Sequence, residues 1–122
     1  MHWEEVLKSS RRKLKFKIFK ESIIEAANEQ GMEFYLDRDF LNRVSELYVE
    51  KYREEFGNLR GTNRKILTKV ISNNQFTIGH VLKNIGFTPH PTRLSGQRIT
   101  LYRRDDEEWF GLIFLKLKYV RQ

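Results

Sequence analysis

The chain has 122 residues, a formal net charge of +7, three histidines and no cysteine. Its length suits a single domain, and an apolar fraction of 39% with nine Phe and five Tyr can fill a hydrophobic core, which argues against a disordered chain. The lack of cysteine excludes a disulfide framework and a thiolate zinc site.

The charges are divided sharply along the chain. Residues 57–104 carry nine Lys and Arg and no Asp or Glu, whereas residues 21–56 carry ten acidic and four basic side chains. A chain that keeps its acids in one segment and leaves another segment free of them offers a defined face to an anionic partner. We therefore expect a surface that binds phosphate groups.

Neither membrane insertion nor catalysis is favoured. No stretch reaches the roughly 18–20 apolar residues of a membrane span, and the N-terminus lacks the apolar core of a signal peptide, so a cytoplasmic protein is expected. The alternating basic and apolar residues 13–20 fit a packed helix better than a membrane-surface segment. There is no phosphate loop, nucleophile elbow or HExxH motif, and acid pairs such as Asp37 and Asp39 suit helix caps. We expect no enzymatic activity, no cofactor and no metal site, since His80 and His90 lack a third ligand.

The first predicted helix covers residues 10–30 and ends at Gly31. Its apolar positions gather on one side, and they are Phe16, Phe19, Ile23, Ala26 and Ala27. The alternation over residues 13–19 also fits a strand, so both interpretations stay open there.

A second helix is expected after an apolar link at residues 32–36, with Asp37 or Asp39 as its cap. Its apolar stripe is continuous and consists of Phe40, Val44, Leu47, Tyr48, Tyr52 and Phe56. Gly57 and Asn58 end this helix.

Two shorter helices follow. Thr62 or Asn63 can cap a helix over residues 64–72. After a polar break, Thr77 can cap a short helix over residues 78–85. The inward positions of the two helices are Ile66, Leu67, Val70, Ile71, Ile78, Val81, Leu82 and Ile85. Two helices joined by a brief polar turn are typical of a helix-turn-helix.

A hairpin is predicted next, because the two prolines of residues 88–92 exclude a helix. Residues 92–94 can pair with residues 98–102 across a turn centred on Ser95 and Gly96. Such a hairpin after a helix-turn-helix is a wing.

The last segment, residues 109–120, favours a strand over a helix because of Gly111, its aromatic residues and its alternation. This strand would complete a three-stranded wing sheet. The whole pattern predicts an α+β fold, a winged helix-turn-helix with an additional N-terminal helix. Residues 1–35 would form the helical extension and residues 36–122 the winged-helix domain.

The candidate DNA contacts are polar and basic side chains on these elements. In a winged helix the second helix of the helix-turn-helix enters the major groove, and the wing contacts the phosphate backbone or the minor groove. Lys and Asn suit guanine and adenine edges. Tyr102 has two uses open to it, stacking on an exposed base and packing within the wing. The candidates are Arg64, Lys65, Lys69, Thr77, His80, Lys83, Asn84, Arg93, Gln97, Arg98, Tyr102, Arg103 and Arg104. We expect most of the affinity to come from the wing.

Several segments of the chain resemble a known replication module. They are SELYVEKYREEF with Ser45, Leu47, Tyr48 and Tyr52, then FTIGHVLKNIGF led by Phe76, the hairpin PTRLSGQRITLYRR and the segment WFGLIFL. Over residues 40–117 the chain resembles the C-terminal winged-helix module of phage, plasmid and poxvirus-type primase–helicases. The extra helix around residues 62–72 and the spacing after Phe76 depart from that pattern.

The resemblance implies a DNA-binding module that works beside an ATPase ring and a priming domain and engages template or fork DNA. The chain would then be a fragment or a stand-alone relative. Two other functions stay open. A transcriptional regulator would be a dimer on a palindromic site, with Phe16, Phe19 and Ile23 in the dimer interface. A protein-interaction module would use residues 21–56 as an acidic docking face. The sequence leaves the preferred DNA structure and the oligomeric state open.

Overall fold

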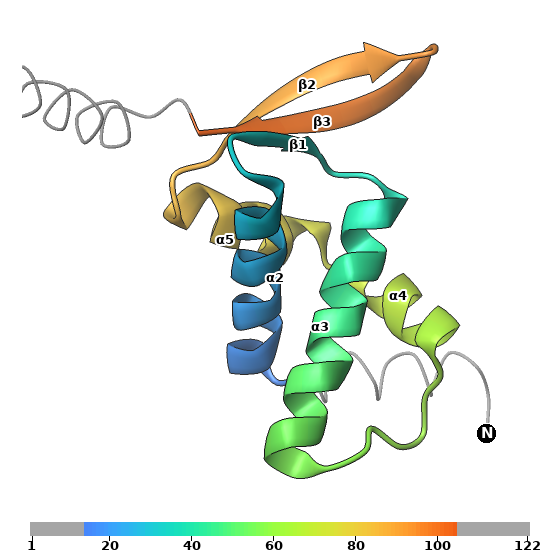
Figure 1. Ribbon diagram of the computed structural model, residues 1–122. Coiled ribbons are helices and arrows are strands. Elements are labelled where there is room, and N and C mark those ends of the chain that lie inside the picture. The colour runs from blue at the N-terminus through green and yellow to red at the C-terminus, as the bar shows by residue number, and fades with distance from the viewer. Residues whose placement is uncertain (1–13, 105–122) are drawn as a thin grey trace, which may run out of the picture.

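The structure, a computed structural model, describes residues 14–104. In chain order these residues form α2 (Phe16–Gln30), β1 (Glu33–Tyr35), α3 (Arg38–Phe56), α4 (Arg64–Ser72), α5 (Gln75–Asn84), β2 (Thr88–Leu94) and β3 (Gln97–Arg103). The helices lie on one side of a three-stranded antiparallel sheet of order β1-β3-β2 (Figure 1). The expected α+β class is confirmed.

The two long helices begin and end where local backbone chemistry dictates. α2 starts at Phe16, so the helical interpretation holds from that residue on, and Gly31 ends it with a φ of 87° that favours glycine. At the start of α3, the Asp37 carboxylate accepts a hydrogen bond from the backbone N–H of Phe40 at 2.9 Å, which confirms Asp37 as the cap. Gly57 ends α3 as expected.

Two residues of the expected apolar stripes are not buried. Phe16 is 61% exposed and Phe56 is 52% exposed. They lie at the ends of α2 and α3 that point away from the sheet (Figure 1), where little of the core remains to cover them. Between these ends the stripe residues are buried as predicted, except Tyr52, which is partly buried.

The start of α5 differs from the prediction. Asn63 caps α4, its side chain accepting from the Ile66 N–H at 2.9 Å, but α5 begins at Gln75 and places Thr77 in its first turn instead of at its cap. The position before α5 is Asn74, whose side-chain amide donates to the carbonyl of Val70 at 2.7 Å. Asn74 therefore ties the turn back to α4 and does not cap α5.

The third strand of the sheet is β1, which the sequence had suggested only as an apolar link. β1 pairs with β3 in the register Glu33↔Arg103, Phe34↔Tyr102 and Tyr35↔Leu101. The strand expected at residues 109–120 lies outside the described residues. A strand of three residues with one buried side chain is too short for an alternation to reveal it.

Phe34 joins the sheet to the helices. Its ring centroid lies 4.4 Å from that of Phe40, 5.2 Å from Phe87 and 5.8 Å from Tyr102. The same hydrophobic cluster includes buried residues of all four described helices. Residues of α2 and β1 thus share a core and a sheet with the rest of the described chain, so the expected boundary between residues 35 and 36 falls inside that core.

Candidate nucleic-acid interface

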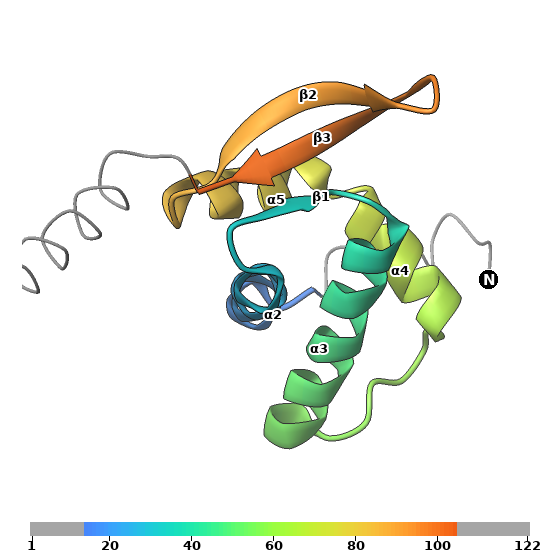
Figure 2. The same cartoon turned by 45° about the horizontal axis from the view of Figure 1, so that its top comes forward.

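The β2–β3 hairpin has a two-residue turn at Ser95 and Gly96. Both residues have a positive φ, 51° and 80°, which is typical of the primed turns that match the twist of a hairpin. Strands of seven residues each extend from this turn, longer than the predicted pairing, and the tip projects beyond the helices (Figure 2). The hairpin is therefore a regular ribbon whose register fixes which side chains face each other.

Arg93 and Arg98 are directly opposite each other near the tip of this ribbon. Both are exposed, and within residues 14–104 neither forms an ion pair or a side-chain hydrogen bond. Like charges at directly opposed positions destabilise a hairpin by a few tenths to about 1 kcal/mol. An anion between the two guanidinium groups would remove this repulsion.

The two arginines lie on the helix-facing side of the sheet. Side chains two residues apart along a strand share a face, so Arg98 is on the same face as Tyr102, and Arg93 is opposite Arg98. Tyr102 is 6% exposed and packs into the core. Towards the tip this face leaves the helical core. A hollow of about 450 Å³ lies there, lined by residues of both faces of the hairpin, Pro91, Thr92, Arg93, Arg98, Ile99 and Thr100.

α5 presents a polar face beside the hairpin. Ile78, Val81 and Leu82 are buried, as predicted, and the helix packs on α2 and β2. The outward side chains are exposed as predicted, and they are His80, Lys83 and Asn84. Thr77 is half-buried.

Gly79 lets α5 and β3 approach closely. A Cβ placed on Gly79 would lie 3.0 Å from the hydroxyl oxygen of Tyr102, closer than most Cβ contacts. Burial raises the pKa of the Tyr102 hydroxyl. Tyr102 is therefore a packing residue under α5, and the alternative that it stacks on a base is wrong for this arrangement.

Two of the expected basic contacts, Arg103 and Arg104, are engaged within the protein at the base of the hairpin. Arg103 forms an ion pair with Glu33 at 3.2 Å. Arg104 lies with its guanidinium 4.5 Å from the centroid of the Phe87 ring and donates a hydrogen bond to Asn28. Among the described residues, its buried Nε has no acceptor. These contacts give Arg103 and Arg104 structural roles at the base of the hairpin.

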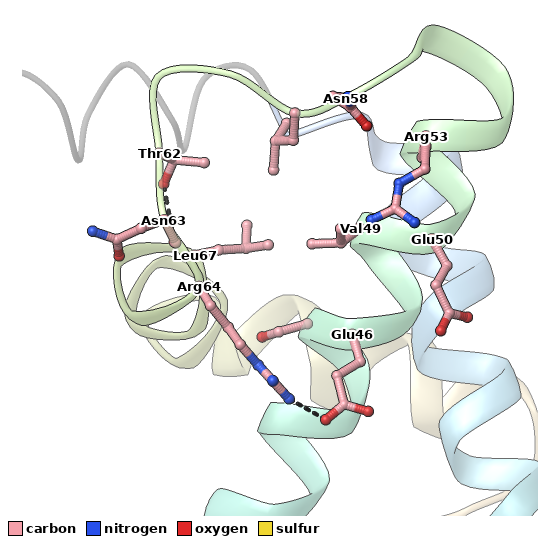
Figure 3. Close-up of a pocket in the computed structure, with 11 residues that line it drawn as sticks. Glu46, Val49, Glu50, Arg53, Asn58, Thr62, Asn63, Arg64 and Leu67 are labelled. Carbon is pink, nitrogen blue, oxygen red and sulfur yellow. Dashed lines mark hydrogen bonds and ion pairs between the residues drawn. The ribbon is translucent and has the colours of Figure 1, made fainter.

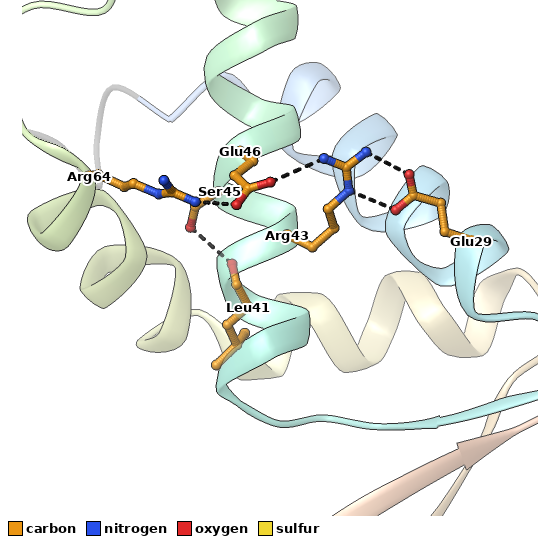
Figure 4. A network of polar contacts seen from close by, with 6 residues as sticks. All are labelled: Glu29, Leu41, Arg43, Ser45, Glu46 and Arg64. Carbon is orange, nitrogen blue, oxygen red and sulfur yellow. Dashed lines mark hydrogen bonds and ion pairs between the residues drawn. The ribbon is translucent and has the colours of Figure 1, made fainter.

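Arg64 belongs to an ion-pair network, named here the helix network, which consists of Glu29, Arg43, Glu46 and Arg64 and links α2, α3 and α4 (Figure 4). Arg43 donates two hydrogen bonds to Glu29, at 2.8 and 2.7 Å, and one to Glu46 at 3.2 Å. This contact lowers the pKa of Glu29 and raises that of Arg43. Arg64 is still largely exposed, but its guanidinium is directed to Glu46.

Lys65 and Lys69 are exposed on α4, as expected. They line a groove of about 680 Å³ between α4 and the start of α3, whose other charged lining residues are Arg38, Arg64 and Asp37. Arg38 is not among the contacts predicted from the sequence, because it belongs to the acidic segment of residues 21–56. Its position beside α4 depends on the tertiary fold.

A second hollow, of about 550 Å³, lies between α3, α4 and the connection between them (Figure 3). Its charged lining residues are Glu46, Glu50, Arg53 and Arg64. The buried Ser45 hydroxyl on its wall donates to the Leu41 carbonyl at 3.0 Å and accepts from Thr68 at 3.1 Å, so it serves packing between helices. No group of three or more His, Asp or Glu within residues 14–104 is arranged to hold a metal ion.

Phe76 is the exposed residue that the sequence did not identify as a contact. It lies in the first turn of α5 and is 90% exposed. The sequence predicts that this helix begins at residue 78, which would leave Phe76 in the turn before it. The signal that could have revealed it is its spacing of four and seven residues from His80 and Lys83.

None of the helices formed by residues 14–104 is long and apolar enough to cross a membrane.

A scan against protein-family models found no match to the chain. Searches of curated proteins and of solved structures likewise found no significant similarity. What the chain does is therefore inferred from its own residues.

Proposed function

We propose that the chain is a non-catalytic DNA-binding module with a winged-helix fold, in which α5 is the recognition helix and the β2–β3 hairpin is the wing. The order of helix, strand, helices and hairpin supports this assignment, as does the strand order β1-β3-β2. The observation that carries it is the opposed pair Arg93 and Arg98, which has no acidic partner in the described chain and lies on the sheet face that packs on α5.

In this proposal the cations of the wing provide electrostatic attraction to DNA, and the side chains of α5 position the module on the DNA. Arg93 and Arg98 contact phosphates, and a guanidinium can bind one phosphate through two hydrogen bonds. Lys83 and Asn84 reach a groove edge or the adjacent backbone. Lys65 and Lys69 extend the basic surface along α4. One lysine on α5 is too few for strong sequence discrimination, so we expect the module to recognise DNA structure more than DNA sequence.

The sequence resemblance sharpens this proposal. It favours a module of a replication protein of the primase–helicase kind, located beside the ATPase ring of that protein and bound to template or fork DNA. Only the resemblance supports the assignment to a replication protein. The geometry of the wing supports DNA binding and no more.

Fluorescence anisotropy with duplex, forked and single-stranded DNA over a range of salt concentrations tests the proposal. Replacing both Arg93 and Arg98 by Ala should weaken binding and reduce the slope of log K against log salt by up to about 2 on duplex DNA, because two phosphate contacts are lost. The matched control replaces Lys17 and Lys20, two exposed cations near the start of α2, at the end opposite the sheet (Figure 1).

The control removes the same charge and should leave the slope close to that of the wild type. Absence of binding at low salt, or equal losses in the two double variants, would reject the proposal. Selection from random duplexes that returns a palindromic motif would favour a dimeric regulator instead. A monomer that binds DNA would disfavour a module that uses its acidic helices for protein docking.

A further inference from the structure

Phe76 differs from the other phenylalanines near it. Phe34, Phe40 and Phe87 are at most 5% exposed, whereas Phe76 is 90% exposed. Among the described aromatic rings, none stacks on Phe76. A single exposed apolar side chain is ordinary on a protein surface, so its surroundings decide whether it has a use.

The position of Phe76 on α5 places it next to the wing. At about 100° per residue, Phe76 and Lys83 lie roughly 60° and 40° around the helix from Gly79, which touches Tyr102 of the hairpin. His80 follows on the same exposed side. The ring therefore protrudes at the boundary between the outward face of α5 and the side that packs on the hairpin.

Phe76 and the wing arginines belong to one surface. The hairpin leaves the body beside the C-terminal end of α5 and runs back over the helix towards its N-terminal end and beyond (Figure 2). Phe76 is in the N-terminal turn, and Arg93 and Arg98 are on the helix-facing side of the hairpin. Along α5, Phe76 therefore lies beyond Lys83 in the direction in which the hairpin runs towards Arg93 and Arg98.

The charges around Phe76 fit a nucleotide. No acid occurs between residues 57 and 104, so the segment that carries the ring, the α5 cation and the wing cations has no carboxylate of its own. Proteins hold unpaired bases with aromatic side chains and nearby cations, since every base has a flat face and each nucleotide within a strand has a phosphate on either side of its sugar. The ring protrudes and lines none of the hollows described above, whereas a docked peptide helix or strand needs a groove or a free edge.

We propose that Phe76 stacks on an unpaired nucleobase, so that the surface formed by α5 and the wing takes single-stranded DNA or the unpaired arm of a fork in preference to uninterrupted duplex. This inference rests on the proposed function and adds the class of DNA to it. Arg93 and Arg98 then hold the phosphates of the strand whose base contacts the ring.

The test compares Phe76→Ala with the wild type on single-stranded, forked and blunt duplex DNA of equal length. Stacking on an aromatic side chain is lost with the ring, so binding to single-stranded and forked DNA should fall about 5- to 100-fold. Binding to the blunt duplex should change less than about twofold, and the salt slope should stay the same because no phosphate contact is removed. Phe76→Tyr should restore most of the affinity.

Phe16→Ala is the matched control, because Phe16 is also an exposed phenylalanine, 61% exposed on α2, at the end opposite the sheet. It should leave binding to every DNA unchanged. If the wild type binds no DNA, the proposed function itself fails. If the wild type binds and its binding depends on Arg93 and Arg98, but Phe76→Ala binds all three DNAs like the wild type, only the stacking proposal is overturned. A large loss of thermal stability in Phe76→Ala, or a dimer that this change dissociates, would overturn it as well, by showing that protein covers the ring.

Discussion

Arg43 on α3 and the two arginines near the tip of the hairpin have opposite surroundings. Arg43 contacts two carboxylates of the helix network and is directed along the protein surface by them. Arg93 and Arg98 face each other on the hairpin, without a described acid near enough to form an ion pair. The residue type is the same in both regions, but one set of charges stabilises the fold and the other costs it stability.

This difference shows that the net charge of a segment does not reveal which of its charged side chains are already paired within the protein. Residues 57–104 form a uniformly basic segment in the sequence, yet Arg64, Arg103 and Arg104 of that segment are engaged by groups elsewhere in the protein. A basic side chain that the fold already satisfies has less to offer a ligand. The cations that remain, on the hairpin and on the outward faces of α4 and α5, are therefore the stronger candidates for phosphate contact.

The largest expected effect comes from removing the aromatic contact that joins the two regions. Phe34→Ala should lower the free energy of unfolding by about 3–5 kcal/mol, because the ring is buried against Phe40, Phe87 and Tyr102 and its loss leaves a cavity. Phe76→Ala should change it by less than about 0.5 kcal/mol. Urea unfolding measures both values, and a comparable loss in the two variants would remove the distinction between core and surface rings.

A smaller effect distinguishes the arginines. Arg43→Met should destabilise the protein by about 1 kcal/mol at low salt, because it removes the centre of the helix network. Arg98→Met should be neutral or stabilise it by up to about 1 kcal/mol, because the repulsion with Arg93 disappears. Both shifts should shrink at high salt. Urea unfolding at two salt concentrations checks this, and destabilisation by Arg98→Met would show that this side chain has a structural partner.

The parts that were predictable from sequence depend on local chemistry. Gly31, Gly57 and the pair Ser95 and Gly96 mark the ends of helices and the hairpin turn, because positive φ angles favour such residues. The outward faces of α4 and α5 follow from the helical period alone.

The features that were missed depend on residues far apart in the chain. Arg64 is 18 residues from Glu46, and Arg104 is 76 residues from Asn28. β1 becomes a strand only because β3 lies beside it. The same holds for the start of α5, where the side chain of Asn74 binds α4 instead of capping the next helix. Sequence patterns therefore identified the basic surface but not which of its arginines the fold had already engaged.

The smallest expected effect is a dependence of stability on pH that belongs to the helix network. The hydrogen bonds from Arg43 lower the pKa of Glu29 below its ordinary value of 4.5, against an opposing effect of desolvation. Below about pH 5.5 the unfolded chain then binds more protons at Glu29 than the folded chain does, so the free energy of unfolding falls as the pH drops through 4.5 and then through the lowered pKa. Both side chains are slightly more than a third exposed, which keeps the contribution to between a few tenths and about 1 kcal/mol.

Urea unfolding between pH 3 and pH 6 should show a weaker pH dependence in Glu29→Gln than in the wild type. Arg43→Met should weaken it as well, and the double variant should add little to either, because one contact causes the shift. A profile for Glu29→Gln that matches the wild type would mean that the Glu29 carboxylate is solvated, and that the helical region does not hold its charges more firmly than the hairpin does.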